Sequence, residues 1–194
     1  LCAAICAWTA DNCEHELADD DRQLEGGRAI VSYQPIGIIL GIQPFNFPAY
    51  QAVRYSIPQL VVGNPVLLKH ASSVWGSALM LEEIYHAAGV PRDIFRVIKS
   101  SNDQTTGLIA DPRVRGVTLT GSGKVGSIIA AEAGKHLKKT VMELGSNDAY
   151  LVLSDADIAT AVKTCVQARL YNNGETCVAA KRFVIVDSVY DEFR

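Results

Sequence analysis

The segment NNGETC (172–177) places a cysteine directly after a glycine-containing turn that follows a helical pattern. A cysteine presented by such a turn can reach a cleft, and its thiolate is the nucleophilic form. A single cysteine is nevertheless more often a small, buried and inert residue. Cys177 is therefore a candidate nucleophile whose role depends on what else the chain provides.

The segment GSGKVG (121–126) follows a strand pattern and opens a helical one. Glycines let the backbone approach a phosphate, and a helix N-terminus offers free N–H groups. This context favours a dinucleotide-binding turn over a tight turn that binds nothing. A plain dinucleotide-binding fold would also carry an acidic residue about 20 positions further on to hold a ribose. Glu143 stands near that distance.

Two further polar residues stand at the ends of strand patterns. Asn46, in PFNFP (44–48), could stabilise an oxyanion with its neutral amide, or could simply cap the following helix. Lys69, in GNPVLLKH (63–70), could meet a ribose or a phosphate, or could be an ordinary surface lysine. Taken singly, each residue is better explained by the plainer alternative.

Alternating helical and strand patterns surround these segments and predict an α/β fold with helices on both faces of a sheet. We expect Pro58 to kink its helix, and Ser154 or Asp155 to cap the helix near 157. The acidic run 19–21 and the Gly26-Gly27 pair interrupt the first helical pattern. Strands are expected at 29–33, 36–42, 65–69, 94–98, 116–120, 139–143, 149–153 and 183–186, and helices at 1–18, 49–62, 73–88, 103–110, 124–133, 157–171 and from 189.

Composition excludes several classes of protein. The net charge is −3 with both signs scattered, which argues against a nucleic-acid partner. No apolar run is long enough for a membrane span. Five cysteines at irregular spacing argue against a disulfide framework, and Cys2 and Cys6 lack the further ligands that a metal site needs. A reducing compartment, most simply the cytoplasm, fits this usage.

Taken together and in order, six segments resemble the aldehyde dehydrogenase superfamily. The resemblance covers essentially the whole chain, and LKHA with its flanks is most similar to the bacterial succinate-semialdehyde dehydrogenase branch. It implies a Rossmann-like cofactor domain and the oxidation of an aldehyde to a carboxylic acid with NAD or NADP. The segments are PIGIILGIQPFNFP (35–48), GNPVLLKHA (63–71), GVPRDIF (89–95), VTLTGSGKVG (117–126), VMELGS (141–146) and NNGETCVAAKRF (172–183).

The resemblance implies that Cys177 attacks the aldehyde carbon to form a thiohemiacetal, and that hydride transfer to the nicotinamide leaves a thioester. It makes Glu143 the general base for Cys177 or for the hydrolytic water rather than a ribose ligand. A carboxylate in that role is expected to be partly buried. Asn46, with the backbone N–H of Cys177, would form the oxyanion hole.

For the cofactor, the resemblance places Lys69 at the adenosine ribose, Ser122 and the Gly121–Gly126 turn at the pyrophosphate, and Val125 on the adenine side. NAD-preferring members often carry Glu three residues after the lysine, where this chain has Ser72. A serine there would not repel a 2′-phosphate. We therefore expect NADP to be used at least as well as NAD.

The substrate is indicated by Arg54, eight residues after Asn46 on the expected helix 49–62. In succinate-semialdehyde dehydrogenases an Arg at the matching place meets the substrate carboxylate, a task that suits bidentate pairing. A surface helix arginine is an equally good explanation. Tyr171 stands where some members carry a second Arg, which weakens the assignment of succinic semialdehyde.

Several positions depart from the family pattern. Glu175 stands where Gln is usual, and a carboxylate near the nucleophile opposes thiolate formation. Gly145-Ser146-Asn147 replaces Gly-Gly-Lys, and Phe45 replaces Trp. These changes leave open a non-catalytic or degenerate paralogue. A second alternative is an enzyme of the same fold that acylates coenzyme A, against which Glu143 argues.

The resemblance divides the chain into a dinucleotide-binding domain at 1–144, with 25–35 in an oligomerisation element, and the start of a catalytic domain at 145–194. Both ends fall inside helical patterns. We therefore expect a longer protein that forms a homo-oligomer, a dimer or a tetramer. We expect this stretch alone to be inactive.

Overall fold

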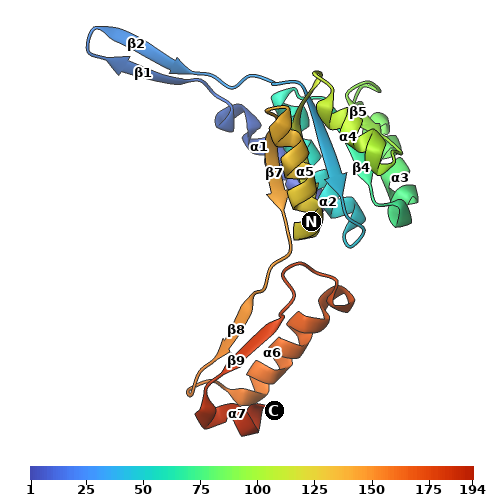
Figure 1. Cartoon of the computed structure of the whole chain (residues 1–194). Coiled ribbons are helices and arrows are strands. Elements are labelled where there is room, and N and C mark those ends of the chain that lie inside the picture. Colours follow the sequence, from blue (N-terminus) through green and yellow to red (C-terminus); the bar gives the residue numbers. More distant parts are fainter. The chain divides into compact units, whose positions relative to one another are not determined.

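Five parallel strands form the central sheet of the unit Leu1–Glu143 (Figure 1). Their order is β5-β4-β3-β6-β7. The computed structural model describes all 194 residues and confirms the expected α/β class with a parallel sheet. The strands are β3 Ile38–Gln43, β4 Val66–His70, β5 Phe95–Val97, β6 Val114–Thr120 and β7 Lys139–Glu143.

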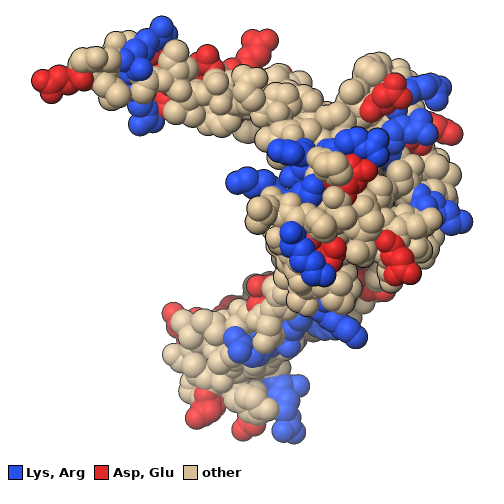
Figure 2. Space-filling view, turned by 45° about the horizontal axis from the view of Figure 1, so that its top comes forward, with Lys and Arg blue, Asp and Glu red and all other residues tan.

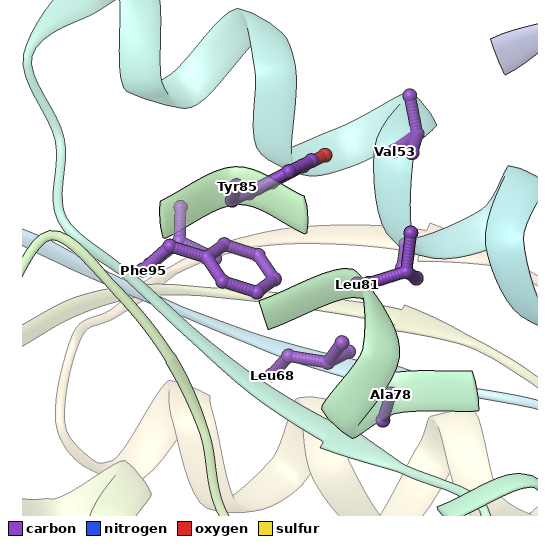
Figure 3. Packing of buried hydrophobic residues seen from close by; sticks show 8 residues of the cluster. Val53, Leu68, Ala78, Leu81, Tyr85 and Phe95 are labelled. Carbon is purple, nitrogen blue, oxygen red and sulfur yellow. The ribbon is translucent and has the colours of Figure 1, made fainter. Parts of the chain in front are cut away.

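Helices cover both faces of this sheet, because side chains alternate between the faces along each strand. Val66 and Leu68 of β4 pack with residues of α2 and α3, while Leu40 of β3 packs with residues of α4 and α5. Figure 3 shows the first cluster, in which Tyr85 and Phe95 lie edge to face at a centroid distance of 4.4 Å. The helices are α1 Cys2–Glu16, α2 Pro48–Val62, η1 Ser72–Val74, α3 Trp75–Ala87, α4 Asn102–Ala110 and α5 Gly123–Lys135.

Helix α2 begins and ends at residues suited to those positions. Pro48 stands in its first turn, where a missing N–H removes no intrahelical bond, and the helix continues through Pro58. Gly63 ends it with a left-handed backbone, φ 96°. The N-cap is Phe47, which makes no side-chain capping bond. Helix capping therefore does not explain Asn46.

A separate antiparallel hairpin joins β1 Asp20–Leu24 to β2 Gly27–Val31. The sequence did not predict β1, because acidic residues are depleted in strands. Here the Asp20 carboxylate accepts from Arg22 and the Asp21 carboxylate accepts from Arg28 across the hairpin. Acidic and basic side chains accordingly lie together on the hairpin in Figure 2.

The unit Leu144–Arg194 has a parallel two-stranded sheet. The N-cap of α6 is Asp157, whose carboxylate accepts from the Thr160 N–H at 2.7 Å, so the expectation of Ser154 or Asp155 was wrong. No helix of either unit combines the length and the apolar character that crossing a membrane requires. The elements are β8 Ala149–Val152, α6 Ile158–Leu170, η2 Tyr171–Gly174, β9 Arg182–Ile185 and α7 Asp187–Phe193.

Candidate active site

The carboxyl ends of the parallel strands place four of the expected site segments at one edge of the sheet. The segment 44–47 follows β3, Lys69 stands near the end of β4, the Gly121–Gly126 turn follows β6 and Glu143 ends β7. Strand order reverses between β3 and β6, since β4 and β5 lie on one side of β3 and β6 and β7 on the other. In open α/β sheets such a switch point is where ligands bind.

The segment that carries Asn46 is held in place by His70, at the end of β4. His70 Nδ1 lies 3.0 Å from the Ala71 nitrogen, whose N–H donates to it, and 3.2 Å from the Gln43 carbonyl oxygen. Nε2 lies 2.9 Å from the Pro48 carbonyl oxygen. His70 is buried, and this bond connects the end of β4 to the start of α2. No motif in the sequence indicated this role for His70.

The turn after β6 has the features of a phosphate-binding helix start. Ser122 is the N-cap of α5, and its hydroxyl accepts from the Val125 N–H at 3.3 Å. The N–H groups of Gly123 and Lys124 have no intrahelical partner, because they belong to the first turn. A Cβ at Gly123 would meet no atom within 4 Å, so the backbone there is open to approach.

The remaining residues expected at the cofactor also present accessible atoms. Lys69 is partly buried, Ser72 is exposed at the start of η1, and Val125 is 43% exposed. Strand β4 is separated from β6 by β3 alone, a distance of roughly 10 Å at the usual strand spacing. Lys69 and the glycine turn thus lie within the span of one dinucleotide, and the residues present fit that group.

Glu143 makes an ion pair that the sequence did not suggest. Arg54 Nη2 of α2 donates to Glu143 Oε1 at 2.7 Å. The side chains are 41% and 46% exposed respectively, so Glu143 is exposed in this unit and not partly buried as expected. Arg54 is therefore an exposed helix arginine whose partner in this unit is Glu143.

The ion pair borders a cavity of about 290 Å³. The cavity lies beside α2, over β3, β6 and β7. Val141 of β7 is 62% exposed there. Gln43 also lines this cavity, and its side-chain amide is buried with no hydrogen-bond partner. A buried amide without a partner costs about 1–3 kcal/mol and is uncommon in folded proteins.

In the second unit, local backbone geometry explains the turn that precedes Cys177. Three consecutive residues adopt a left-handed backbone, with φ of 50° at Asn172, 56° at Asn173 and 75° at Gly174. Asn and Gly adopt this conformation most readily. The turn ends at Thr176, which is buried and donates its hydroxyl to the Tyr171 carbonyl at 3.2 Å.

Cys177 itself is partly exposed. Its carbonyl oxygen accepts from Lys181 Nζ and lies 2.8 Å from Ser146 Oγ, whose single proton is shared between this carbonyl and the Asp148 carboxylate. Ser146 is one of the residues at which the chain departs from the expected Gly-Gly-Lys. A glycine at this position could not make that bond. The departure therefore adds a contact to the backbone of the candidate nucleophile within this unit.

Comparison with known proteins agrees with these features. The sequence model of the aldehyde dehydrogenase family matches residues 1–194. The chain belongs to the aldehyde dehydrogenase family. The family resemblance stated from the motifs is thereby confirmed.

Relatives within the aldehyde dehydrogenase family are named succinate-semialdehyde dehydrogenases. The chain is 43% identical over 192 residues to a probable NADP(+) succinate-semialdehyde dehydrogenase of Synechocystis sp., a match that covers 99% of this chain and 42% of the relative. It is 40% identical over 191 residues to an NAD(P)+ succinate semialdehyde dehydrogenase of Escherichia coli, covering 98% and 41%. The chain thus spans about two fifths of the length of these relatives.

A solved structure shows the same fold. The crystal structure of succinic semialdehyde dehydrogenase from Streptococcus pyogenes, in complex with NADP+, is 44% identical and matches with a TM-score of 0.96. The match covers 100% of this chain and 42% of that chain. Within the chain, the first unit brings Arg54 and Glu143 together and sets Lys69 and the glycine turn at one edge. Cys177 belongs to the second unit.

Proposed function

We propose that the protein that carries this chain oxidises an aldehyde to a carboxylic acid with NADP or NAD, and that its substrate is succinic semialdehyde. The proposal is carried by one observation: Asn46, Lys69, the Gly121–Gly126 turn and Glu143 all lie at or just beyond the carboxyl ends of neighbouring parallel strands. Relatives named for this reaction, with NADP(+) or NAD(P)+ in their names, support the choice of substrate and cofactor.

The residues 1–144 form the dinucleotide-binding part of this proposal, and 145–194 begin the catalytic part. Lys69 binds the adenosine ribose, while the N–H groups of the α5 N-terminus bind the pyrophosphate beside Ser122. The exposed Val125 side chain provides an apolar surface for the adenine. Ser72 leaves room and no negative charge for a 2′-phosphate. When bound, the cofactor accepts the hydride that the substrate loses.

The chain's own residues carry the acyl chemistry. The thiolate of Cys177 bonds to the aldehyde carbon, giving a thiohemiacetal and, after oxidation, a thioester. The Asn46 amide and the Cys177 backbone N–H donate to the oxyanion that develops on the former carbonyl oxygen. Glu143 takes the proton of the water that cleaves the thioester, which releases the carboxylic acid and the free thiol.

Arg54 supplies the specificity for a carboxylated substrate. A guanidinium binds a carboxylate with two parallel N–H donors, which an ammonium does not do. The partly exposed Arg54 side chain borders the cavity described above, where a short chain with a terminal carboxylate would have space. A homo-oligomer, a dimer or tetramer, is a further prediction for this protein.

The experiment that tests the proposal measures reduced-nicotinamide formation with succinic semialdehyde and NADP by the protein that carries this chain. We expect turnover in the parent, none in Cys177→Ala, and a slow release of product in Glu143→Gln. A matched control is Cys165→Ala, because Cys165 is the buried cysteine of the same unit. That variant should keep its turnover.

Two outcomes would reject the proposal. Equal turnover in the parent and in Cys177→Ala would show that Cys177 is not the nucleophile. Folded protein that binds NADP but oxidises none of several aldehydes would favour a non-catalytic relative, and Glu175 would be the first position to revert to Gln. Formation of an acyl-coenzyme A on adding coenzyme A would favour the acylating alternative.

A further inference from the structure

Arg54 and Glu143 are given separate tasks by the proposed function, yet they are bonded to each other. The bond from Arg54 Nη2 to Glu143 Oε1 is 2.7 Å long and joins residues 89 positions apart. Because both side chains are more than a third exposed, solutes can reach the pair. A substrate carboxylate that approaches Arg54 therefore meets a guanidinium already engaged with the general base.

We infer that Arg54 is shared between Glu143 and the carboxylate of the substrate, so that a carboxylated aldehyde loosens the hold on Glu143 as it binds. This inference rests on the proposed function. A guanidinium has five N–H donors in a fork, and the bond to Glu143 uses one of its nitrogens. A second carboxylate either takes the remaining side of the fork or displaces Glu143. In both cases two anions compete for one cation, so each weakens the binding of the other.

The surroundings of the pair make Arg54 the cation that an incoming carboxylate would meet at this edge. Among the residues that line the cavity, the cations are Arg54 and Lys139, and the anion is Glu143. Lys139 starts β7, four residues and about 13 Å before Glu143. The other polar side chains of the lining are neutral: Gln43, Gln51, Tyr55, Gln59, Thr118, Thr120 and Thr140.

Sharing has a consequence for specificity. An uncharged aldehyde leaves the ion pair closed, so Glu143 stays bonded to Arg54 during the hydrolytic step. A carboxylated aldehyde binds to Arg54 and frees Glu143 in the same event. The terminal carboxylate therefore raises kcat as well as lowering KM. A simple binding role for Arg54 would affect ground-state affinity and leave kcat unchanged.

The test uses succinate, an unreactive dicarboxylate, and measures its Kd by titration calorimetry with the protein that carries this chain. Glu143→Gln keeps the shape and removes the charge, so it should bind succinate about two- to fivefold more tightly, the range of an exposed ion pair. Arg54→Gln should bind succinate more weakly than the parent. In the Arg54→Gln background, adding Glu143→Gln should change nothing. Lys139→Gln is the matched control and should keep the parent affinity.

Equal succinate affinity in the parent and in Glu143→Gln would overturn the inference. Tightening that persists in the Arg54→Gln background would also overturn it, because the gain would not pass through Arg54. If Arg54→Gln does not fold, Arg54→Lys keeps a cation, and the Glu143→Gln effect should shrink in that background. Turnover of succinic semialdehyde is measured separately. Coupling without turnover rejects the proposed function alone, and turnover without coupling rejects the inference alone.

Discussion

His70 Nε2 lies 2.9 Å from the carbonyl oxygen of Pro48, and this bond connects the end of β4 to the start of α2. Replacing His70 with Ala removes this bond and leaves a cavity in place of a buried ring, while the Ala71 N–H keeps its bond to the Gln43 carbonyl oxygen at 3.0 Å. We expect the free energy of unfolding to fall by about 1–3 kcal/mol. Urea unfolding followed by tryptophan fluorescence measures this, because Trp8 and Trp75 both belong to the first unit.

His136→Ala is the control for that experiment. The His136 side chain is 36% exposed, and its ring bonds to Glu132 at 3.3 Å. Loss of such a surface contact should cost less than about 1 kcal/mol. Equal losses in the two variants would show that the bond to Pro48 has no special role.

Gly41 of β3 is the place where the ring of Tyr55 approaches the sheet. A Cβ at Gly41 would lie 2.0 Å from the ring, closer than any real contact. We expect Gly41→Ala to destabilise the first unit by about 1–3 kcal/mol or more, since the buried ring must shift. The double variant Gly41→Ala/Tyr55→Leu should recover part of the loss. Urea unfolding of both variants provides the comparison.

Gly107→Ala is the matched substitution for Gly41→Ala. Gly107 lies inside α4, and a Cβ there would meet no atom within 4 Å. Alanine is the better helix former, so this variant should gain up to about 1 kcal/mol. Glycine-to-alanine substitution should therefore lower the free energy of unfolding at Gly41 and raise it at Gly107. A change of the same sign at both positions would contradict the packing argument.

Tyr85 should make the protein less stable in alkaline solution. Burial raises its pKa from 10.0 to about 12, although the hydrogen bond with Ser56 acts in the opposite direction. Between pH 10 and about 12 the unfolded chain releases the phenolic proton while the folded protein keeps it. The unfolded state then binds fewer protons, so the free energy of unfolding falls as pH rises, by up to about 3 kcal/mol.

Comparison with Tyr85→Phe isolates this effect. The variant has no phenol at position 85, so its stability should fall less steeply over the same pH range. Burial also raises the pKa of Tyr55, so absorbance titration of the folded parent should show two fewer phenols ionising near pH 10 than the unfolded chain does. Parallel pH profiles for the parent and Tyr85→Phe would contradict the prediction.

Ser72→Glu should change cofactor preference. Under the proposed function a carboxylate at this exposed position repels the 2′-phosphate of NADP and leaves NAD unaffected. We expect the ratio of NADP affinity to NAD affinity to fall by about tenfold or more. Titration with each cofactor measures the ratio. The control is Thr106→Glu, which adds the same charge at an exposed position of α4 and should leave the ratio unchanged. A similar fall of the ratio in both variants would indicate a general charge effect.

Most of the fold follows from local pattern, and the misses have local causes. The β3 and β4 strands are largely apolar runs that can be recognised because both faces of a parallel sheet are covered. Strand β1 was not predicted because Asp20 and Asp21 are poor strand residues. In the structure their charges are offset by hydrogen-bonded arginines, Arg22 and Arg28. The cap of α6 was placed two or three residues too early, since Ser154, Asp155 and Asp157 all precede the helix and each residue type can cap a helix.

For the candidate site, features formed by neighbouring residues could be predicted, and contacts between distant residues could not. The sequence alone indicated which residues are candidates for chemistry, because the turn NNG before Cys177 and the cap Ser122 before α5 are formed by neighbouring residues. The shared edge of the strand ends follows from the parallel pairing of β3, β4, β6 and β7. Only the tertiary structure decided that Arg54 bonds to Glu143 and that His70 bonds to Pro48. These partners are 89 and 22 positions apart, and their contact depends on how α2 packs against a sheet whose register no local pattern specifies.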